Sequence, residues 1–113
     1  MVILSRRLNE AVVFGDRFIL TVARLLLEGA ELTIQEMTGG PPSLSPIGIG
    51  DSIDIGLGVR MTLVEIGIGS CGMKARLGFD VPANISLYRK EVWDDVRGPS
   101  WYPHGAGGEP SPN

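Results

Sequence analysis

The sequence repeats itself at an offset of 41 residues, and this repeat limits the possible folds more than any other feature. Its register is unbroken over residues 8–25. The matched pairs are Leu8/Ile49, Glu10/Asp51, Val12/Ile53, Phe14/Ile55, Gly15/Gly56, Phe18/Val59, Leu20/Met61, Thr21/Thr62, Val22/Leu63 and Leu25/Ile66. The match resumes with a small shift at residues 30–34 and 73–77. Matching apolar residues alone are weak evidence for a duplication. The shared turn glycine and the shared threonine argue against chance, so we interpret the pattern as a duplication.

Each copy consists of short segments rich in β-branched and large apolar residues, separated by turn residues such as Gly15-Asp16. We expect strands at residues 2–7, 11–14, 18–22, 30–37, 52–55, 59–66, 73–79 and 85–88. Residues 89–97 have helical spacing, in which Trp93 packs inward, and Gly98-Pro99 ends the helix. The prediction is a mainly β protein: a small antiparallel β-sandwich or barrel of about eight strands with one short C-terminal helix.

The two copies are incomplete in complementary ways. The first, at about residues 1–37, lacks a counterpart of residues 80–89, so we expect it to have lost its last strand and helix. The second, at about residues 47–97, has Ser45-Pro46-Ile47-Gly48 opposite Leu4-Ser5-Arg6-Arg7. Because this segment has a proline and no basic pair, we expect that copy to have lost its first strand. Residues 38–46 are the predicted linker within one domain of residues 1–97, and residues 98–113 are a predicted disordered tail.

Composition excludes several classes of function. No apolar run reaches the length that crosses a bilayer, and early charges interrupt any signal-peptide core, so we expect a cytoplasmic protein. Cys71 is the only cysteine and His104 the only histidine in the sequence, which argues against disulfides within the chain, thiolate metal sites and a Cys-His couple. The turn glycines lack the residues that follow a phosphate-binding loop, and no catalytic constellation is present. We therefore expect neither enzymatic activity nor a cofactor.

A family resemblance rests on the start and the end of the chain. VILSRRLNEAVVFGD, followed by a hairpin, resembles the start of the carbon storage regulators (CsrA/RsmA). KARLGFDVP and ISLYRKEVW resemble the last two strands of that family and the opening of its helix. The resemblance implies a small cytoplasmic bacterial protein that binds GGA-containing messenger RNA, often over the ribosome-binding site, and changes translation or message stability. Members of the family are not enzymes.

The resemblance also implies an architecture. Family chains have five strands and interleave as a homodimer, in which the first strand of one subunit lies close to the last strand of the other. The present chain is about twice as long and keeps one first strand and one last strand, from different copies. We therefore expect a fused, monomeric pseudo-dimer with one RNA site. The alternative is a strand-swapped homodimer in which the site spans two chains.

The predicted RNA site combines two edge strands with basic side chains. Arg6, Arg7, Arg89 and Lys90 could donate to phosphates and to guanine O6 and N7. By resemblance, the remaining site residues are Leu4 and Ser5 on one wall, Val81, Pro82 and Ile85 on the other, and Leu87 and Tyr88 nearby. Tyr88 stands where the family usually has histidine, and Lys90 where an acid is common.

Two interpretations compete with RNA binding. An arginine pair at a strand end, seen alone, is most often solvated surface. The second basic pair, Arg89-Lys90, reverses that preference. The other interpretation is a protein-binding module that acts as a decoy or antagonist of a regulator or docks an assembly factor. A net charge of -3 favours it slightly, because loose binding to nucleic acid depends on positive charge.

Overall fold

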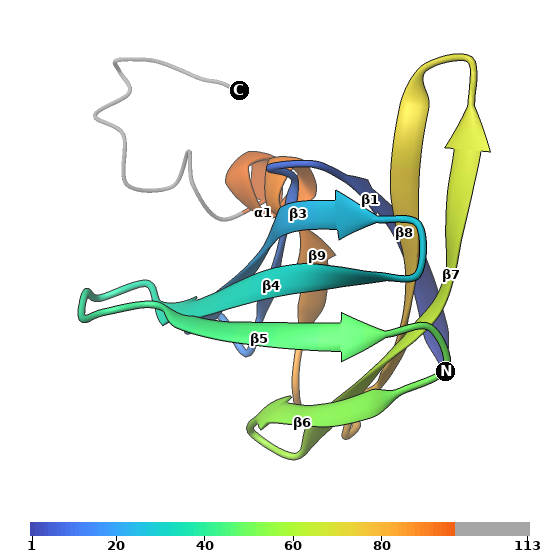
Figure 1. Cartoon of the computed structure of the whole chain (residues 1–113). Coiled ribbons are helices and arrows are strands. Elements are labelled where there is room, and N and C mark those ends of the chain that lie inside the picture. Colours follow the sequence, from blue (N-terminus) through green and yellow to red (C-terminus); the bar gives the residue numbers. More distant parts are fainter. Residues whose placement is uncertain (97–113) are drawn as a thin grey trace.

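In the computed structural model, which describes residues 1–96, the chain forms nine strands and one short helix. The strands are β1 (Val2–Arg7), β2 (Ala11–Phe14), β3 (Phe18–Leu26), β4 (Gly29–Glu36), β5 (Ser43–Gly48), β6 (Ser52–Gly56), β7 (Val59–Gly69), β8 (Gly72–Asp80) and β9 (Leu87–Arg89), and the helix is α1 (Lys90–Val96). The expected mainly β, antiparallel fold with a short C-terminal helix is confirmed. The strands pair as two separate sheets and do not close into a barrel (Figure 1).

The two halves of the chain exchange their outer strands. One sheet has the order β1-β8-β7-β6, in which three strands of the second half take β1 from the first half. The other has the order β5-β4-β3-β2-β9, in which three strands of the first half lie between β5 and β9 of the second half. Neither sheet is therefore built from one half alone.

Backbone details recur at the offset of 41 residues found in the sequence. Asn9 N–H donates to the Val22 carbonyl, and Gly50 N–H donates in the same way to Leu63. The positive φ angles of Asn9, Gly15 and Asp16 recur at Gly50, Gly56 and Leu57. The β3–β4 ladder shifts register between Val22 and Arg24, and the β7–β8 ladder does so between Leu63 and Glu65. The two halves thus share turns and bulges as well as strands.

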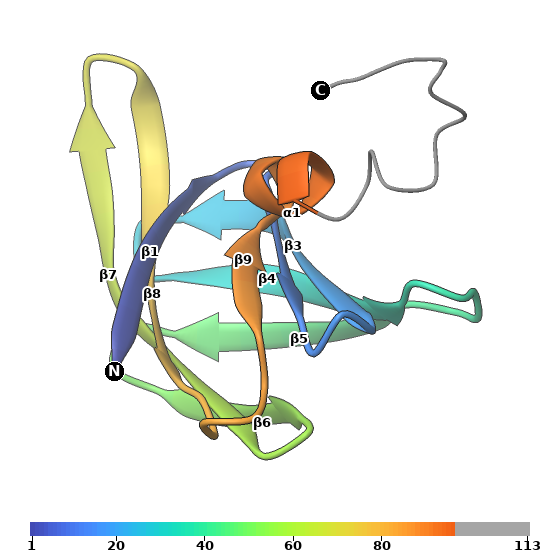
Figure 2. The same cartoon turned by 180° about the vertical axis from the view of Figure 1, so that it is seen from behind.

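The core lies between the two sheets and receives side chains from both halves. Val12, Phe14 and Leu20 of one sheet and Met61, Leu63 and Phe79 of the other are completely buried within a single cluster. Alternate residues of each strand point inward because successive side chains leave a strand on opposite faces. The strands of the two sheets run across each other around this cluster (Figures 1 and 2).

One expectation from the sequence is wrong. The second half keeps its first strand: β5 pairs along its whole length with β4, and it begins 41 residues after β1 does. Pro46 is tolerated there because β5 is an edge strand, on which one missing donor can face solvent. The segment between β4 and β5 is accordingly shorter than the predicted linker. The predicted tail, residues 98–113, lies outside the described residues, and no helix within residues 1–96 is long and apolar enough to span a membrane.

Candidate nucleic-acid interface

The first and last strands, β1 and β9, are edge strands of different sheets. Within residues 1–96, β1 pairs only with β8, and β9 pairs only with β2. Both strands run toward α1, so their C-terminal ends approach each other there (Figure 2). A further hydrogen bond, from Gly15 N–H to the Ser86 carbonyl at 2.8 Å, holds the chain that leads into β9. An edge strand has one side that no neighbouring strand covers, and that side exposes backbone donors and acceptors.

Arg6 joins the end of β1 to α1, the helix that directly follows β9. Its Nη1 and Nη2 donate to Glu91 Oε1 and Oε2 at 2.8 and 2.9 Å, so the two groups form a bidentate pair. Nη1 also donates to the Ala11 carbonyl at 3.2 Å, and Nε to the Ser5 carbonyl at 2.8 Å. Arg6 is only 5% exposed, the lowest value for any charged residue in the described chain. The pair therefore fixes the end of β1 against the start of α1, within a single chain.

The electrostatics of this pair follow from its geometry. The hydrogen bonds from Arg6 lower the pKa of Glu91 from 4.5 to about 2, with help from its own backbone hydrogen bond. The hydrogen bond with Glu91 raises the pKa of Arg6, and burial opposes that rise only in part. Both groups are thus charged at neutral pH.

This geometry contradicts the prediction that Arg6 donates directly to RNA. Its donors are committed to Glu91 and to two carbonyls, and its side chain faces inward. Arg7, the next residue along β1, points to the opposite face and is exposed. Arg6 therefore holds the end of β1 against α1, while exposed Arg7 can reach a ligand. Sequence reasoning did not find Glu91, because it lies 85 positions from its partner and no local pattern joins the two.

Arg89 and Lys90 also differ in whether the charged group is paired within the fold or exposed. Arg89 is exposed at the end of β9, and among residues 1–96 its side chain has no hydrogen bond or ion pair. Lys90 lies 2.6 Å from Asp94 Oδ1 and stands over the Trp93 ring, 5.8 Å from its centroid. Trp93 is buried and donates to Asp16 Oδ1 at 3.0 Å, which confirms its predicted packing role. Arg89 is the cation of this pair that is available to a ligand.

The predicted apolar site residues lie at the margin of the core. Leu4, Val81, Ile85 and Leu87 are half-buried and pack against the central cluster. Ser5, Pro82 and Tyr88 are also half-buried. These residues can therefore offer only part of each side chain, together with the backbone edges of β1 and β9, to a bound molecule.

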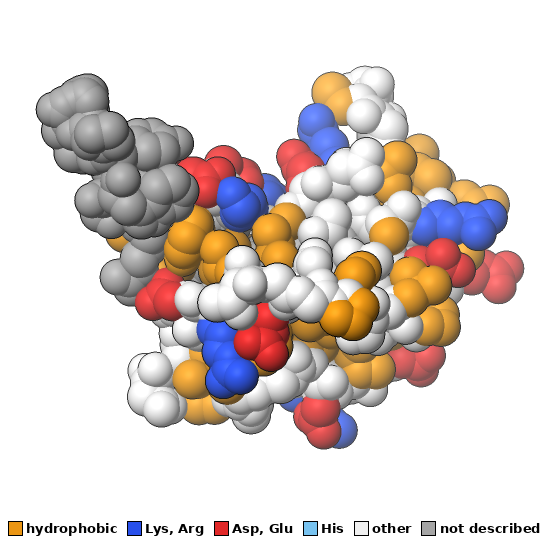
Figure 3. Space-filling model, turned by 90° about the vertical axis from the view of Figure 1, so that its left-hand side faces the viewer, with side chains coloured by type: hydrophobic (Ala, Val, Ile, Leu, Met, Phe, Trp, Pro, Cys, Tyr) orange, Lys and Arg blue, Asp and Glu red, His pale blue; other side chains and the backbone are white. Residues whose placement is uncertain are grey.

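Most cations of the protein are neutralised by a neighbouring acid. Nine of the ten Lys and Arg residues lie within residues 1–96, and five of them are ion-paired with acidic side chains: Arg6, Arg17, Arg60, Arg76 and Lys90. On the face that Figure 3 displays, blue and red side chains lie beside one another. The four cations that form no ion pair within residues 1–96 are Arg7, Arg24, Lys74 and Arg89, and the charge of Arg89 also helps to lower the pKa of Glu91. Sequence reasoning singled out Arg7 and Arg89 but not Arg24 or Lys74.

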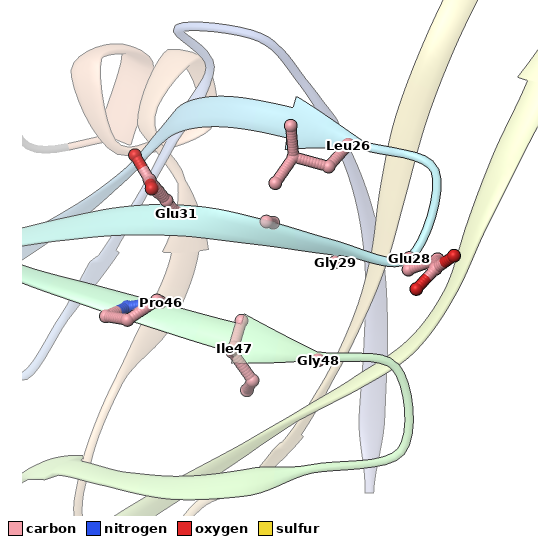
Figure 4. Close-up of a pocket in the computed structure, with 8 residues that line it drawn as sticks. Leu26, Glu28, Gly29, Glu31, Pro46, Ile47 and Gly48 are labelled. Carbon is pink, nitrogen blue, oxygen red and sulfur yellow. The ribbon is translucent and has the colours of Figure 1, made fainter.

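A pocket of about 330 Å³ near the β3–β4 turn has the opposite character. Leu26, Pro46 and Ile47 give it an apolar lining, and the carboxylates Glu28 and Glu31 stand at its two sides (Figure 4). No cation from residues 1–96 lines it, so an anionic ligand would meet repulsion there. We therefore do not assign nucleic acid to this pocket.

The residues described have no group of three or more His, Cys, Asp or Glu side chains that could hold a metal ion. The free edges of β1 and β9 offer backbone hydrogen-bonding groups, the positive charges of Arg7 and Arg89, and partly exposed apolar surface. In comparisons with known proteins, the sequence matches no family model, and no solved structure matches the fold.

Proposed function

We propose that this protein is a post-transcriptional regulator that binds GGA motifs in unpaired loops or leaders of messenger RNA, and so modulates translation or message stability. The observation that carries the proposal is the pair between Arg6 at the end of β1 and Glu91 in α1, two residues after exposed Arg89 at the end of β9, with exposed Arg7 next to Arg6. Unpaired loop bases expose edges that hydrogen-bond and faces that stack, and two free strand edges with arginines suit them.

The strand exchange between the halves supports the resemblance to the carbon storage regulators. In that family the first strand of one subunit lies close to the last strand of the other, and here β1 and β9 come from different halves. The shared turns and bulges at the offset of 41 residues fit a fusion of two such subunits. In this proposal the chain is a pseudo-dimer with one RNA site.

The opposite edge of the molecule explains why only one site is proposed. β5 occupies the place of β1 in the second half, but the residues at the positions of Arg6 and Arg7 are Ile47 and Gly48. β6 is the counterpart of β2, and in the described chain it has no strand like β9 beside it. That edge therefore lacks both the basic residues of β1 and a neighbouring strand equivalent to β9.

A gel-shift assay tests the proposal. The wild-type protein is titrated into a hairpin with GGA in its loop, in excess non-specific RNA, and into the same hairpin with the loop scrambled. We expect binding of the first at least about ten-fold tighter, because wrong bases leave donors unpaired at a cost of about 1–3 kcal/mol each. Equal binding of the two hairpins would overturn the proposal.

The number of sites is tested by light scattering of the free protein, followed by titration with the GGA hairpin well above the dissociation constant. A monomer that saturates at one RNA per chain is expected. A dimer would contradict the single-chain site, because β1 and β9 would then be swapped between molecules.

The alternative, a protein-binding decoy, antagonist or docking module, predicts a different result from the same assay. Such a protein would bind a regulator or assembly factor and would not distinguish GGA from scrambled loops. The acidic, apolar pocket near the β3–β4 turn is the feature that favours this alternative.

A further inference from the structure

Three of the four cations that form no ion pair within residues 1–96 line one region of the surface. Arg7, at the end of β1, lines two adjoining hollows with volumes of about 460 and 160 Å³. Arg24 of β3 lines the larger hollow, and Lys74 of β8 lines the smaller. The hollows also share Cys71 in the β7–β8 turn, and this hairpin extends beyond the rest of the described chain (Figure 1). We name the two hollows together the basic cleft.

The side chains of Arg7, Arg24 and Lys74 form no ion pair within residues 1–96, although the Glu10 carboxylate accepts a hydrogen bond from the backbone N–H of Arg7 at 2.7 Å. No acidic residue of the described chain lines either hollow. Arg7 and Lys74 are directly opposite each other in the β1–β8 ladder, and like charges in such a pair destabilise a sheet. Arg24 is opposite Glu31 in the β3–β4 ladder, but no ion pair joins their side chains. In a chain with net charge -3, this concentration of unbalanced cations indicates a site for anions.

The basic cleft is continuous with the proposed RNA site. Arg7 follows Arg6, and Arg6 contacts Glu91, which lies two residues after Arg89. A strand of RNA bound along β1 and β9 would thus reach the cleft by passing the end of β1. The cleft itself offers three cations with a floor of Leu8, Leu25 and Met73, and residues 1–96 place no aromatic ring in it for stacking. These features suit a sugar-phosphate backbone better than unpaired bases.

We propose that the basic cleft binds the phosphates of the RNA segment that flanks the recognised loop, through Arg7, Arg24 and Lys74. This inference rests on the proposed function and adds a second contact region to it. Bases at the β1/β9 edge would supply sequence preference, and phosphates in the cleft would supply affinity that does not depend on sequence.

The test compares two RNAs with the same GGA loop: a minimal hairpin, and the same hairpin with single-stranded extensions. The variant to be tested is R24Q/K74Q, which removes two positive charges from the basic cleft and keeps Arg7 and Arg89. We expect its affinity for the extended RNA to fall at least about five-fold. The slope of log affinity against log salt should shrink by about 1.4, because each phosphate of a single strand that the protein neutralises adds about 0.7 to that slope. Affinity for the minimal hairpin should change less than about two-fold, because its few phosphates lie near the β1/β9 edge.

R17Q/R60Q is the matched control. It also removes two cations, and both are about half exposed and ion-paired outside the cleft. Because its net charge equals that of R24Q/K74Q, it should bind both RNAs like the wild type if position matters more than total charge. Equal losses in the two double variants, or equal losses on the two RNAs, would overturn the proposal.

Thermal unfolding of K74Q checks the charge repulsion on its own. Its melting temperature should equal or exceed that of the wild type, because the change removes a like charge opposite Arg7. A clearly lower melting temperature would contradict the repulsion on which the proposal rests.

The outcomes also separate this proposal from the proposed function. If the wild type prefers GGA but R24Q/K74Q binds both RNAs unchanged, the cleft assignment fails and the function stands. If the wild type ignores GGA but gains affinity from extensions that R24Q/K74Q loses, the cleft binds phosphates and the function fails.

Discussion

The strands β1 and β5 hold equivalent positions in the two halves, yet only β1 carries basic residues. Both have six residues, both are edge strands, and their starts are 41 residues apart. β1 ends in Arg6-Arg7, whereas β5 ends in Ile47-Gly48. Ile47 is buried and adds to the core, while Arg6 is buried and pairs with Glu91. Backbone pairing is thus retained in both halves, and the proposed function depends on basic side chains that β1 has and β5 lacks.

Among the variants that test this comparison, Arg89→Ala should have the largest effect on RNA affinity. The change removes a charge-assisted interaction worth about 1.5–3 kcal/mol, so affinity for a GGA hairpin should fall roughly ten-fold or more. Titration by gel shift measures it. Arg60→Ala, which removes an exposed cation paired with Asp54, is the control and should bind normally. If a folded Arg89→Ala variant binds the hairpin as tightly as the wild type, β9 contributes no more to RNA binding than β5 does.

A smaller effect is expected from Glu91→Gln, which keeps the shape of the side chain and removes its charge. Arg6 is buried, but the Glu91 side chain is 60% exposed, so solvent screens the pair and we expect a loss of about 1–2 kcal/mol at pH 7. Urea denaturation measures it. Glu65→Gln breaks an ion pair between two exposed side chains and should cost less than about 0.5 kcal/mol.

The same variant makes a pH prediction. The folded pKa of Glu91 is about 2 and its reference value is 4.5, so its charge stabilises the fold fully above about pH 4.5. That contribution is lost as the pH falls from 4.5 toward 2. The stability difference between wild type and Glu91→Gln should therefore shrink across this range. A difference that stays constant from pH 6 to about pH 2 would show that the Glu91 charge is not the cause.

The smallest effect should come from Pro46→Ser, which places in β5 the residue that β1 has at Ser5. Pro46 is exposed on an edge strand, so we expect stability to change by less than about 0.5 kcal/mol. The variant should still bind one hairpin per chain, because β5 gains no cation and no partner strand. Saturation at two hairpins per chain would show that Pro46 alone prevents RNA binding at a second site on β5.

Sequence reasoning was most successful where the signal was periodic. β-branched segments and turn glycines located eight of the nine strands, and the helix was expected within a residue of its start. β5 was missed because a proline usually argues against a strand, and only the topology reveals that β5 lies at an edge. Edge position depends on the whole fold and leaves no local mark in the sequence.

The sequence drew attention to Arg6 and Arg7 but could not distinguish the positions that their side chains take in the fold. Arg6 and Arg7 look alike in the sequence, yet alternation along β1 turns one inward and the other outward. The buried one, Arg6, pairs with Glu91, a partner far along the chain that no local pattern reveals. The unbalanced cations Arg24 and Lys74 were missed for a related reason, since an ion pair or its absence depends on tertiary neighbours.

The exchange of strands between the halves also has a consequence for how the chain folds. Val2 pairs with Phe79, so during synthesis β1 must wait for its partner strand until β8 has been made. Pairing between such distant residues requires loop closure before it contributes stability, which slows folding. Until β8 arrives, the apolar residues of β1 have no partner, and unpaired strands favour aggregation. Late pairing should make newly synthesised chains more dependent on chaperones than a protein of this size with local pairing.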